Sequence, residues 1–251
     1  MEEDGDSDAE QQAMRLLLPL GDSDDCDSDC ADLDAGDAAA THATCHEITV
    51  SPGVTLRVFT HAACGIAWQL WPAAHVACQY ASSHPQLWRG ARVCELGAGC
   101  GLTGLRAACL GAHVTLTDLP DVVDGVLADN AAANVDAIAA CGGGGSVQVA
   151  PLAWGDAAHI ADLCSGEPWD VLLCADVVYR RHLIAPLVAT LRAMATSGTL
   201  VVIAHLKRFK LEAEFWKLLA RHFTPREEVF VEAHPQAGQK RPVRVYTCKL
   251  R

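Results

Sequence analysis

The chain has 251 residues, and 51% of them are hydrophobic, which is enough apolar material for a packed core. Its formal charge of −12 is concentrated at one end: residues 1–40 contain 14 Asp and Glu residues and one basic residue, whereas the rest of the chain carries 18 basic and 17 acidic residues. Because that body is nearly neutral, composition argues against nonspecific nucleic-acid binding. The sequence also lacks an apolar run of the roughly 20 residues that cross a membrane.

The N-terminal segment MEEDGDSDAEQQ has neither the basic nor the apolar region of a signal peptide. We therefore expect an intracellular protein, located in the cytoplasm with the nucleus as an alternative. Residues 1–44 are rich in Asp, Ser, Ala and Gly, which predicts a disordered acidic tail, and residues 45–251 are predicted to form one domain. Within the tail, the apolar residues 14–22 are either a docking motif or a segment without function.

Twelve cysteines raise the questions of disulfides and of metal binding. Most lie in apolar runs, where an intracellular thiol behaves as a small hydrophobic residue, so we expect them to be reduced. Cys26, Cys30, His42 and His46 have a spacing not far from that of a Cys₂His₂ zinc site. Between these pairs Leu33 is the only large apolar side chain, so the small core that packs beside zinc is missing. An acidic tail without metal is therefore the favoured interpretation.

From residue 46 onward the pattern is that of an α/β domain. Alternation around a Ser-Pro-Gly turn predicts a β-hairpin over 46–59, and the apolar stretch 65–85, with prolines near its start and stop, predicts a buried helix. Strands and helices then alternate, at 91–96, 102–110, 113–117, 121–138, 146–154, 169–179, 182–195, 198–206 and 211–223. This rhythm predicts a mostly parallel, Rossmann-like sheet with helices on both faces. The last strands, 226–233 and 243–250, are joined by too short a loop for a crossover helix, which predicts an antiparallel hairpin.

A glycine-rich turn, ELGAGCG, follows the first strand of this sheet. In a doubly wound sheet that turn lies at the carboxyl edge, where ligands bind. Gly99, Gly101 and Gly104 also satisfy the dinucleotide pattern, with Asp118 nineteen residues past Gly99. A dinucleotide and S-adenosylmethionine therefore both remain candidates, since Asp118 could accept hydrogen bonds from the ribose of either. Glu95 is a poor neighbour for a pyrophosphate but a reasonable one for the amino group of S-adenosylmethionine.

Four segments, VCELGAGCGLTGL, VTLTDLP, PLAWGD and DVLLCADVVY, occur in an order and spacing that resemble the seven-strand S-adenosylmethionine-dependent methyltransferases. They are especially similar to the group that methylates protein lysines, related to nicotinamide N-methyltransferase-like enzymes. The resemblance runs from about residue 46 to the C-terminus. The glycine motif marks only the broad superfamily, whereas DVVY, LAWGD and the upstream WQLWP narrow it to the lysine group.

The resemblance implies S-adenosylmethionine as cofactor and assigns residues to it one at a time. The implied cofactor contacts are Trp71, Glu95, Gly97, Ala98, Gly99, Gly101, Asp118, Trp154 and Ala175. Trp68 is a rival to Trp71, although the spacing to the glycine loop favours Trp71. Trp154, at the end of the third strand, would lie beside the adenine, with ordinary core packing as its alternative role.

The same resemblance places the reacting centre at Asp176 and Tyr179. Methyl transfer from a sulfonium needs a neutral amine as nucleophile, and free lysine has a pKa of about 10.4, so the enzyme must desolvate and orient that amine. Asp176 would hold the incoming ammonium and steer its lone pair, and Tyr179 would offer its ring face and hydroxyl. The alternative role of Asp176 is to cap the next helix.

The sequence thus predicts a monomeric protein-lysine methyltransferase that binds neither nucleic acid nor a membrane. Three alternatives stay open: methylation of a small amine or of another protein residue, an NAD-dependent oxidoreductase, and a binding module without turnover. Cys100 has no adjacent base, so nucleophilic catalysis is not expected there. Arg180 and Arg181 are interpreted as solvated charges. The stripe of aromatic residues at 209, 215, 216 and 223 is interpreted as core.

Overall fold

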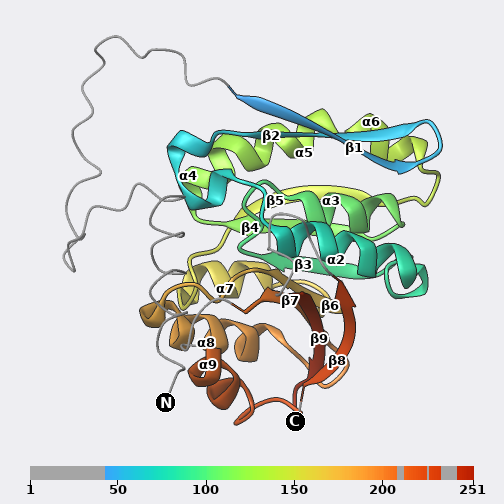
Figure 1. Ribbon diagram of the computed structural model, residues 1–251. Helices are drawn as coiled ribbons and strands as arrows, with labels where there is room; N and C mark the ends of the chain where they lie inside the picture. The colour runs from blue at the N-terminus through green and yellow to red at the C-terminus, as the bar shows by residue number, and fades with distance from the viewer. Residues whose placement is uncertain (1–42, 208–211, 225, 233–241) are drawn as a thin grey trace, which may run out of the picture. The chain divides into compact units, whose positions relative to one another are not determined.

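Seven strands form one sheet, and helices lie in the segments that connect most of them (Figure 1). The computed structural model describes residues 43–207, 212–224, 226–232 and 242–251. Along the chain the strands are β3 (Arg92–Leu96), β4 (His113–Asp118), β5 (Ser146–Pro151), β6 (Val171–Ala175), β7 (Leu200–Leu206), β8 (Glu227–Glu232) and β9 (Val243–Lys249). Their order in the sheet is β5-β4-β3-β6-β7-β9-β8, in which β3 to β7 are parallel. β9 is antiparallel to both β7 and β8, which confirms the mostly parallel fold and the C-terminal hairpin.

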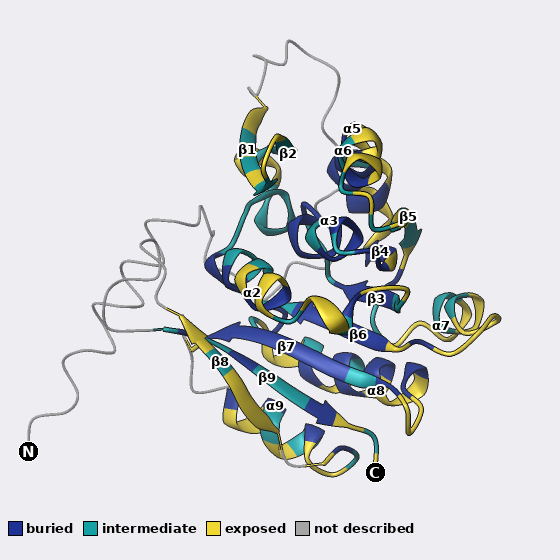
Figure 2. Cartoon of the chain, turned by 90° about the vertical axis from the view of Figure 1, so that its right-hand side faces the viewer, coloured by how far each residue is buried: buried dark blue, intermediate teal, exposed yellow. Residues whose placement is uncertain are grey.

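Helices cover both faces of this sheet, as predicted (Figures 1 and 2). Within the described ranges, the helices of eight residues or more are α2 (Pro72–Ser83), α3 (Leu102–Cys109), α8 (Ile184–Met194) and α9 (Glu212–Leu219). One face packs against α2 and α3 through residues such as Val93 and Val202, and the other packs against α8 and α9 through residues such as Leu172 and Ile203. The strands alternate in this way because successive side chains point to opposite faces. Buried residues therefore concentrate in the central strands (Figure 2).

The N-terminal hairpin predicted over 46–59 is confirmed as β1 (Thr44–Ser51) and β2 (Val54–Thr60), which form a separate antiparallel pair. Two buried asparagines of the helical segment after β4 bind the free edge of β2. Asn130 Oδ1 accepts from the Phe59 amide at 2.7 Å, and Asn134 Oδ1 accepts from the Arg57 amide at 2.8 Å, while both side-chain amides donate back to the carbonyls of the same strand residues. The asparagines thus take the place of a third strand.

The single helix predicted over 121–138 is wrong, because that segment is broken into four parts. They are α4 (Pro120–Val122), the π-helical turn η4 (Val123–Leu127), α5 (Ala128–Ala133) and α6 (Val135–Ala140). Gly125 has non-helical dihedrals (φ −103°, ψ −119°), and a Cβ there would lie 2.3 Å from the Trp68 ring. The break at Asn134 coincides with its bonds to β2. Contacts distant in sequence therefore override the local helix pattern.

Two strands are shorter than predicted, and one helix was missed. β5 ends at Pro151, so Trp154 lies in a turn beyond it, followed by the unpredicted α7 (Ala157–Leu163). β6 ends at Ala175, because Asp176 has φ +60° and leaves the extended conformation. The remaining short turns are η1 (Ala62–Cys64), η2 (Ile66–Trp68), η3 (Pro85–Leu87) and η5 (Arg181–Leu183).

The predicted tail, residues 1–44, lies almost wholly outside the described residues, as do the apolar residues 14–22 and three of the four candidate zinc ligands, Cys26, Cys30 and His42. The domain boundary at residue 45 therefore stays a prediction. The ten cysteines within the described ranges are free thiols. Across those ranges, every helix is too short or too polar to cross a membrane.

Candidate active site

Four loops that follow parallel strands meet at the carboxyl edge of the sheet, where the strand order reverses beside β3. This reversal is the position where doubly wound sheets bind ligands. The loops begin at Gly97 after β3, at Leu119 after β4, at Leu152 after β5 and at Asp176 after β6. All the predicted site residues except Trp71 therefore lie in one of these loops or at the end of the strand that precedes it.

The glycine loop turns sharply through backbone conformations that glycine adopts readily. Gly97, Gly99 and Gly101 have φ angles of +65°, +54° and +79°, in the left-handed region. Their surroundings leave no room for side chains, since a Cβ on Gly99 would lie 2.8 Å from the Ala67 carbonyl oxygen. Gly101 then caps α3, whereas residues 97–99 remain partly exposed. The loop thus leaves backbone partly exposed at this edge, and cofactor contact by Gly97, Ala98 and Gly99 stays a prediction.

Asp118 ends β4 and holds the glycine loop. Its Oδ2 accepts a hydrogen bond from the Gly99 amide and its Oδ1 accepts one from the Leu119 amide, both at 2.8 Å. Burial raises the pKa of this carboxyl above its usual range, and the two backbone hydrogen bonds act in the opposite direction. Each oxygen keeps a further lone pair, so a partly exposed Asp118 can still accept hydrogen bonds from ribose hydroxyls.

Glu95 lies on β3 with only 1% of its surface exposed, and it points toward α3. Its Oε2 accepts from the Gly104 amide at 2.8 Å, which caps the first turn of that helix. Burial raises the pKa of Glu95 to about 8, against the opposing hydrogen bond from Gly104. From the sequence, Glu95 is expected to attract the amino group of the cofactor by its charge, whereas the raised pKa favours a neutral carboxyl near pH 7. A cofactor contact at Glu95 stays a prediction.

The segment around η2 covers the glycine loop. The Ala67 carbonyl lies against Gly99 and accepts the Cys100 thiol at 3.7 Å. The Trp71 indole donates to the Ile66 carbonyl at 3.0 Å, so Trp71 holds this cover in place. Trp68, the alternative to Trp71 in the sequence, instead packs its ring against Gly125 of η4. A role of Trp71 in cofactor binding stays a prediction.

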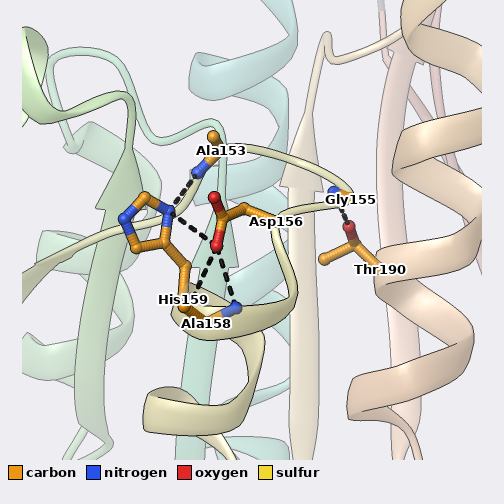
Figure 3. A network of polar contacts seen from close by, with 6 residues as sticks. All are labelled: Ala153, Gly155, Asp156, Ala158, His159 and Thr190. Atoms are coloured by element: carbon orange, nitrogen blue, oxygen red, sulfur yellow. Dashed lines mark hydrogen bonds and ion pairs between the residues drawn. The ribbon is translucent and has the colours of Figure 1, made fainter.

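Trp154 lies in the turn after β5. A polar network that involves its neighbours Ala153 and Gly155 secures this turn (Figure 3). The Gly155 amide donates to Thr190 Oγ1 at 2.8 Å, and the Ala153 amide donates to His159 Nδ1 at 3.2 Å. Asp156 caps α7 by accepting from two amides at 2.9 Å each, and the bond from the His159 amide is the main cause that lowers its pKa. The Trp154 ring lies where a Cβ on Gly97 would meet it, at 2.9 Å.

Both flanks of Trp154 are thus tied down by backbone hydrogen bonds, and its partly exposed indole packs beside the glycine loop. Two residues of the LAWGD segment thus have local structural roles: Gly155 has φ +88°, and Asp156 caps the next helix. Adenine contact by Trp154 stays a prediction.

Asp176 follows Ala175 at the end of β6 and is the only described residue other than glycine with a positive φ. Its amide donates to the Ala204 carbonyl at 2.9 Å, and its Oδ1 accepts from the Leu206 amide at 3.4 Å. The side chain is 3% exposed, so the carboxylate is turned toward β7. The Leu206 amide belongs to β7, so this hydrogen bond is not the helix cap that the sequence offered as an alternative.

Tyr179 is half-buried near the same edge. Burial is the main cause that raises the pKa of its phenol, and the Asp118 carboxylate adds to this effect while Arg180 opposes it. The Tyr179 hydroxyl is therefore a neutral hydrogen-bonding group within electrostatic range of Asp118. The structure thus brings together the strand-end acid of the glycine loop and the tyrosine of the DVVY segment.

Sequence reasoning missed two residues that support this edge. Asn130 donates from Nδ2 to the Cys100 carbonyl in the glycine loop at 2.9 Å, and His205 on β7 lies beside Asp176. Asn130 and Asn134 recur four residues apart in a helical pattern, which is the one signal that could have marked them as buried polar groups on one helix face. For His205, inside an apolar strand, no such signal exists.

The remaining predictions have mixed outcomes. Burial, then Asp118, raises the pKa of the Cys100 thiol to about 12, which disfavours its reactive thiolate form. Arg181 is exposed and forms an ion pair with Glu214 at 2.8 Å. Phe215 and Phe223 are fully buried, as expected for core, whereas residue 209 lies outside the described ranges.

Comparison with known proteins identifies the family. The lysine methyltransferase family matches residues 50–222. The chain is 34% identical over 180 residues to EEF1A lysine methyltransferase 3 of Mus musculus, which covers 71% of this chain and 70% of that protein. It is also 34% identical over 163 residues to protein N-lysine methyltransferase METTL21A of Danio rerio, which covers 65% of this chain and 71% of that protein.

Among solved structures, magnesium protoporphyrin IX methyltransferase from Synechocystis PCC 6803 with bound S-adenosylmethionine aligns with 70% of this chain and 76% of that chain, at a TM-score of 0.48 and 18% identity. The family match spans the strands and loops of the site, from the N-terminal hairpin through α9. The chain belongs to the lysine methyltransferase family.

Proposed function

We propose that this enzyme transfers a methyl group from S-adenosylmethionine to a lysine side chain of a protein, at the carboxyl edge of β3, β4, β5 and β6. The observation that carries the proposal is the hydrogen bond from the Gly99 amide to Asp118, with Tyr179 in electrostatic range of the same carboxylate. This arrangement joins the loop suited to a cofactor with the segment suited to the methyl acceptor.

The residues present fit the cofactor. Asp118 offers lone pairs to ribose hydroxyls, and the glycine loop lets backbone approach the ligand closely. The Trp154 indole, held beside Gly97, supplies an apolar surface suited to adenine. When bound, S-adenosylmethionine supplies an electrophilic methyl group on a sulfonium. Trp71 supports the glycine loop indirectly, because its indole holds the Ile66 carbonyl in the segment that covers this loop.

At the acceptor end, the chain must bring a lysine in as a cation and let it react as a neutral amine. Asp176 attracts the ammonium and lowers the cost of bringing it into the site. The Tyr179 phenol, kept protonated by burial, provides a hydroxyl that accepts from or donates to the amine. The ammonium proton leaves to solvent before transfer. Bound at this edge, S-adenosylmethionine would supply the methyl group, and Asp176 and Tyr179 would hold the neutral amine so that its lone pair faces that group.

Two of the similar proteins are named for elongation factor 1A, from Mus musculus and Xenopus tropicalis. Their identities of 34% and 32% support this factor as the first protein substrate to test. Methylation of a small amine stays the alternative that the sequence leaves open. The monomeric state, the cytoplasmic or nuclear location and the absence of nucleic-acid or membrane binding stay predictions from the sequence.

The test is methyl transfer in vitro. The full-length protein is incubated with methyl-tritiated S-adenosylmethionine and elongation factor 1A, then with whole-cell extract, and labelled residues are identified by mass spectrometry. We expect label on lysine of one or a few proteins. Label confined to small molecules, or to a residue other than lysine, would contradict the proposal.

A matched variant separates chemistry from binding. Asn adopts the left-handed backbone conformation as readily as Asp, so Asp176→Asn removes the charge and keeps the turn. We expect kcat to fall by about 100-fold and the Kd for S-adenosylmethionine to change by less than about threefold. Equal losses in both would assign Asp176 to the cofactor instead.

A further inference from the structure

Residues 61–71, between β2 and α2, form a cover over the glycine loop. The cover contains only the short turns η1 and η2, and it is closed on itself by hydrogen bonds. The His61 amide donates to the Trp68 carbonyl at 2.9 Å, and the Gln69 side-chain amide donates to the Gly65 carbonyl at 3.4 Å. Because turns this short are marginally stable alone, the cover depends on its contacts with the rest of the domain.

The cover contacts the segments on both sides of Asp118. Toward the loop after β3, the Ala67 carbonyl oxygen lies 2.8 Å from the position of a Cβ on Gly99. Toward the segment after β4, the Trp68 ring lies on Gly125 of η4, where a Cβ would be 2.3 Å from Cη2 and within 3.3 Å of two more ring atoms. Since Asp118 ends β4 and binds the Gly99 amide, both contacts border the place where this acid would hold a ribose.

The turn η4 gives the Trp68 ring a fixed support. Val126 and Leu127 of this turn are at most 1% exposed. Leu127 also packs against the glycine loop, because a Cβ on Gly101 would lie 2.9 Å from its Cδ1. Gly125 has non-helical dihedrals at the point where the ring is seated. The absence of a side chain at residue 125 therefore lets the ring come this close, and a Cβ there would displace it.

The Trp68 ring is also held within the cover. The His61 ring lies at 89° to it, with 5.8 Å between the ring centroids, and the Trp68 amide donates to the Gly65 carbonyl at 3.3 Å. Ala67, whose carbonyl lies on the glycine loop, is the preceding residue in the chain. A shift of the ring away from Gly125 therefore moves the part of the cover that contacts this loop.

We propose that Trp68 is a positioning residue that latches the cover: its ring, seated on Gly125, keeps the cover closed on the glycine loop and so strengthens the binding of S-adenosylmethionine. This inference rests on the proposed function, which places the cofactor at this edge. Trp68 acts through the backbone that it positions. The fraction of molecules with a closed cover then sets the apparent Kd for the cofactor.

The first test removes the ring. Trp68→Ala is compared with Trp216→Ala, which truncates another partly buried tryptophan, on α9 at the opposite face of the sheet. Calorimetry gives the Kd for S-adenosylmethionine at a temperature where urea unfolding shows both variants to be folded. We expect this Kd to rise by about tenfold in Trp68→Ala and by less than about twofold in Trp216→Ala. A wild-type Kd in Trp68→Ala would overturn the inference.

The second test crowds the ring. Gly125→Ala should raise the Kd by a similar factor, whereas Gly198→Ala should not, because a Cβ at this exposed glycine would meet only Thr196 Oγ1, at 3.8 Å. The double variant Trp68→Phe/Gly125→Ala should recover most of the affinity, since the shorter phenylalanine ring ends before the position of the new methyl group. A double variant that binds no better than Gly125→Ala would assign the loss to the backbone of η4 and overturn the inference.

A third readout needs neither cofactor nor activity. The Cys100 thiol is 2% exposed and donates to the Ala67 carbonyl at 3.7 Å, so opening of the cover should expose it. Alkylation of the cofactor-free protein by N-ethylmaleimide is followed by peptide mass spectrometry, with Cys94 in the other core cluster as internal reference. We expect Cys100 to react several-fold faster in Trp68→Ala than in wild type, while Cys94 keeps its rate.

An unchanged Cys100 rate in Trp68→Ala would overturn the latch and leave the proposed function intact. Wild-type protein that binds S-adenosylmethionine but labels no lysine would overturn the proposed function instead.

Discussion

Asp118 Oδ2 accepts a hydrogen bond of 2.8 Å from the Gly99 amide, so the acid at the end of β4 holds the turn at the end of β3. The other oxygen accepts from the Leu119 amide, which fixes the plane of the carboxylate. A single side chain therefore shapes the glycine loop and presents lone pairs at the same edge. Loss of this side chain should affect cofactor binding through both routes.

Asp118→Ala is expected to weaken S-adenosylmethionine binding by about 10–100-fold, because a hydrogen bond to a charged group contributes about 1.5–3 kcal/mol. Calorimetric titration of the purified variant measures the change. Asp162→Ala, at an exposed acid on α7, serves as the control and should keep the wild-type affinity. Wild-type affinity in Asp118→Ala would show that the cofactor does not depend on this edge of the sheet.

Glu95 should make the stability of the protein fall as pH rises. Burial raises its pKa to about 8 in the folded state, whereas the unfolded chain has a value of about 4.3, so the folded state binds more protons between these pH values. The free energy of unfolding therefore decreases from about pH 5 to about pH 8 on account of this group.

Glu95→Gln keeps an oxygen that can accept from the Gly104 amide and removes the titration. We expect the variant to gain stability relative to wild type as pH rises, by at most about 1.4 kcal/mol per pH unit in that window. Urea unfolding at pH 5.5, 7.0 and 8.5 measures the difference. Parallel pH dependences in the two proteins would show that Glu95 does not titrate there.

Asn130 and Asn134 allow a paired test of the support behind the glycine loop. Each side chain satisfies both backbone groups of one residue of β2, so either alanine variant should lower the free energy of unfolding by about 2–4 kcal/mol. Only Asn130 also binds the Cys100 carbonyl.

We therefore expect Asn130→Ala to weaken S-adenosylmethionine binding by several-fold, and Asn134→Ala to leave it near wild type at a temperature where both variants are folded. Urea unfolding and calorimetry on both variants supply the two measurements. Equal affinities in the two variants would remove Asn130 from the support of the loop.

Much of the site could be predicted because its residues follow strands. Apolar runs mark strand ends, and parallel strands bring those ends to one edge, so Gly97, Asp118 and Asp176 were identifiable before any coordinates. The exact ends were harder to predict. β6 ends at Ala175, although the hydrophobic pattern predicts a strand to residue 179, because Asp176 takes a left-handed conformation that this pattern does not encode.

The helix after β4 shows why local patterns fail. Residues 121–138 have a continuous helical pattern. The helix is nevertheless broken at Gly125, where the Trp68 ring packs, and at Asn134, whose side chain hydrogen-bonds to the edge of β2. Both partners lie more than 50 residues upstream in the sequence. Their contacts exist only once the chain has folded, so their energies are invisible to any pattern of neighbouring residues.

The sequence by itself determined the α/β class, the glycine loop, the acid that follows the second strand and the family-like segments that point to lysine methylation. These features depend on residue type and on spacing along the chain. Only the tertiary structure decided that Glu95 caps α3 within the core, and that Asp176 turns inward beside His205 of β7. Burial raises the pKa of Glu95, and that burial depends on which strands and helices become neighbours.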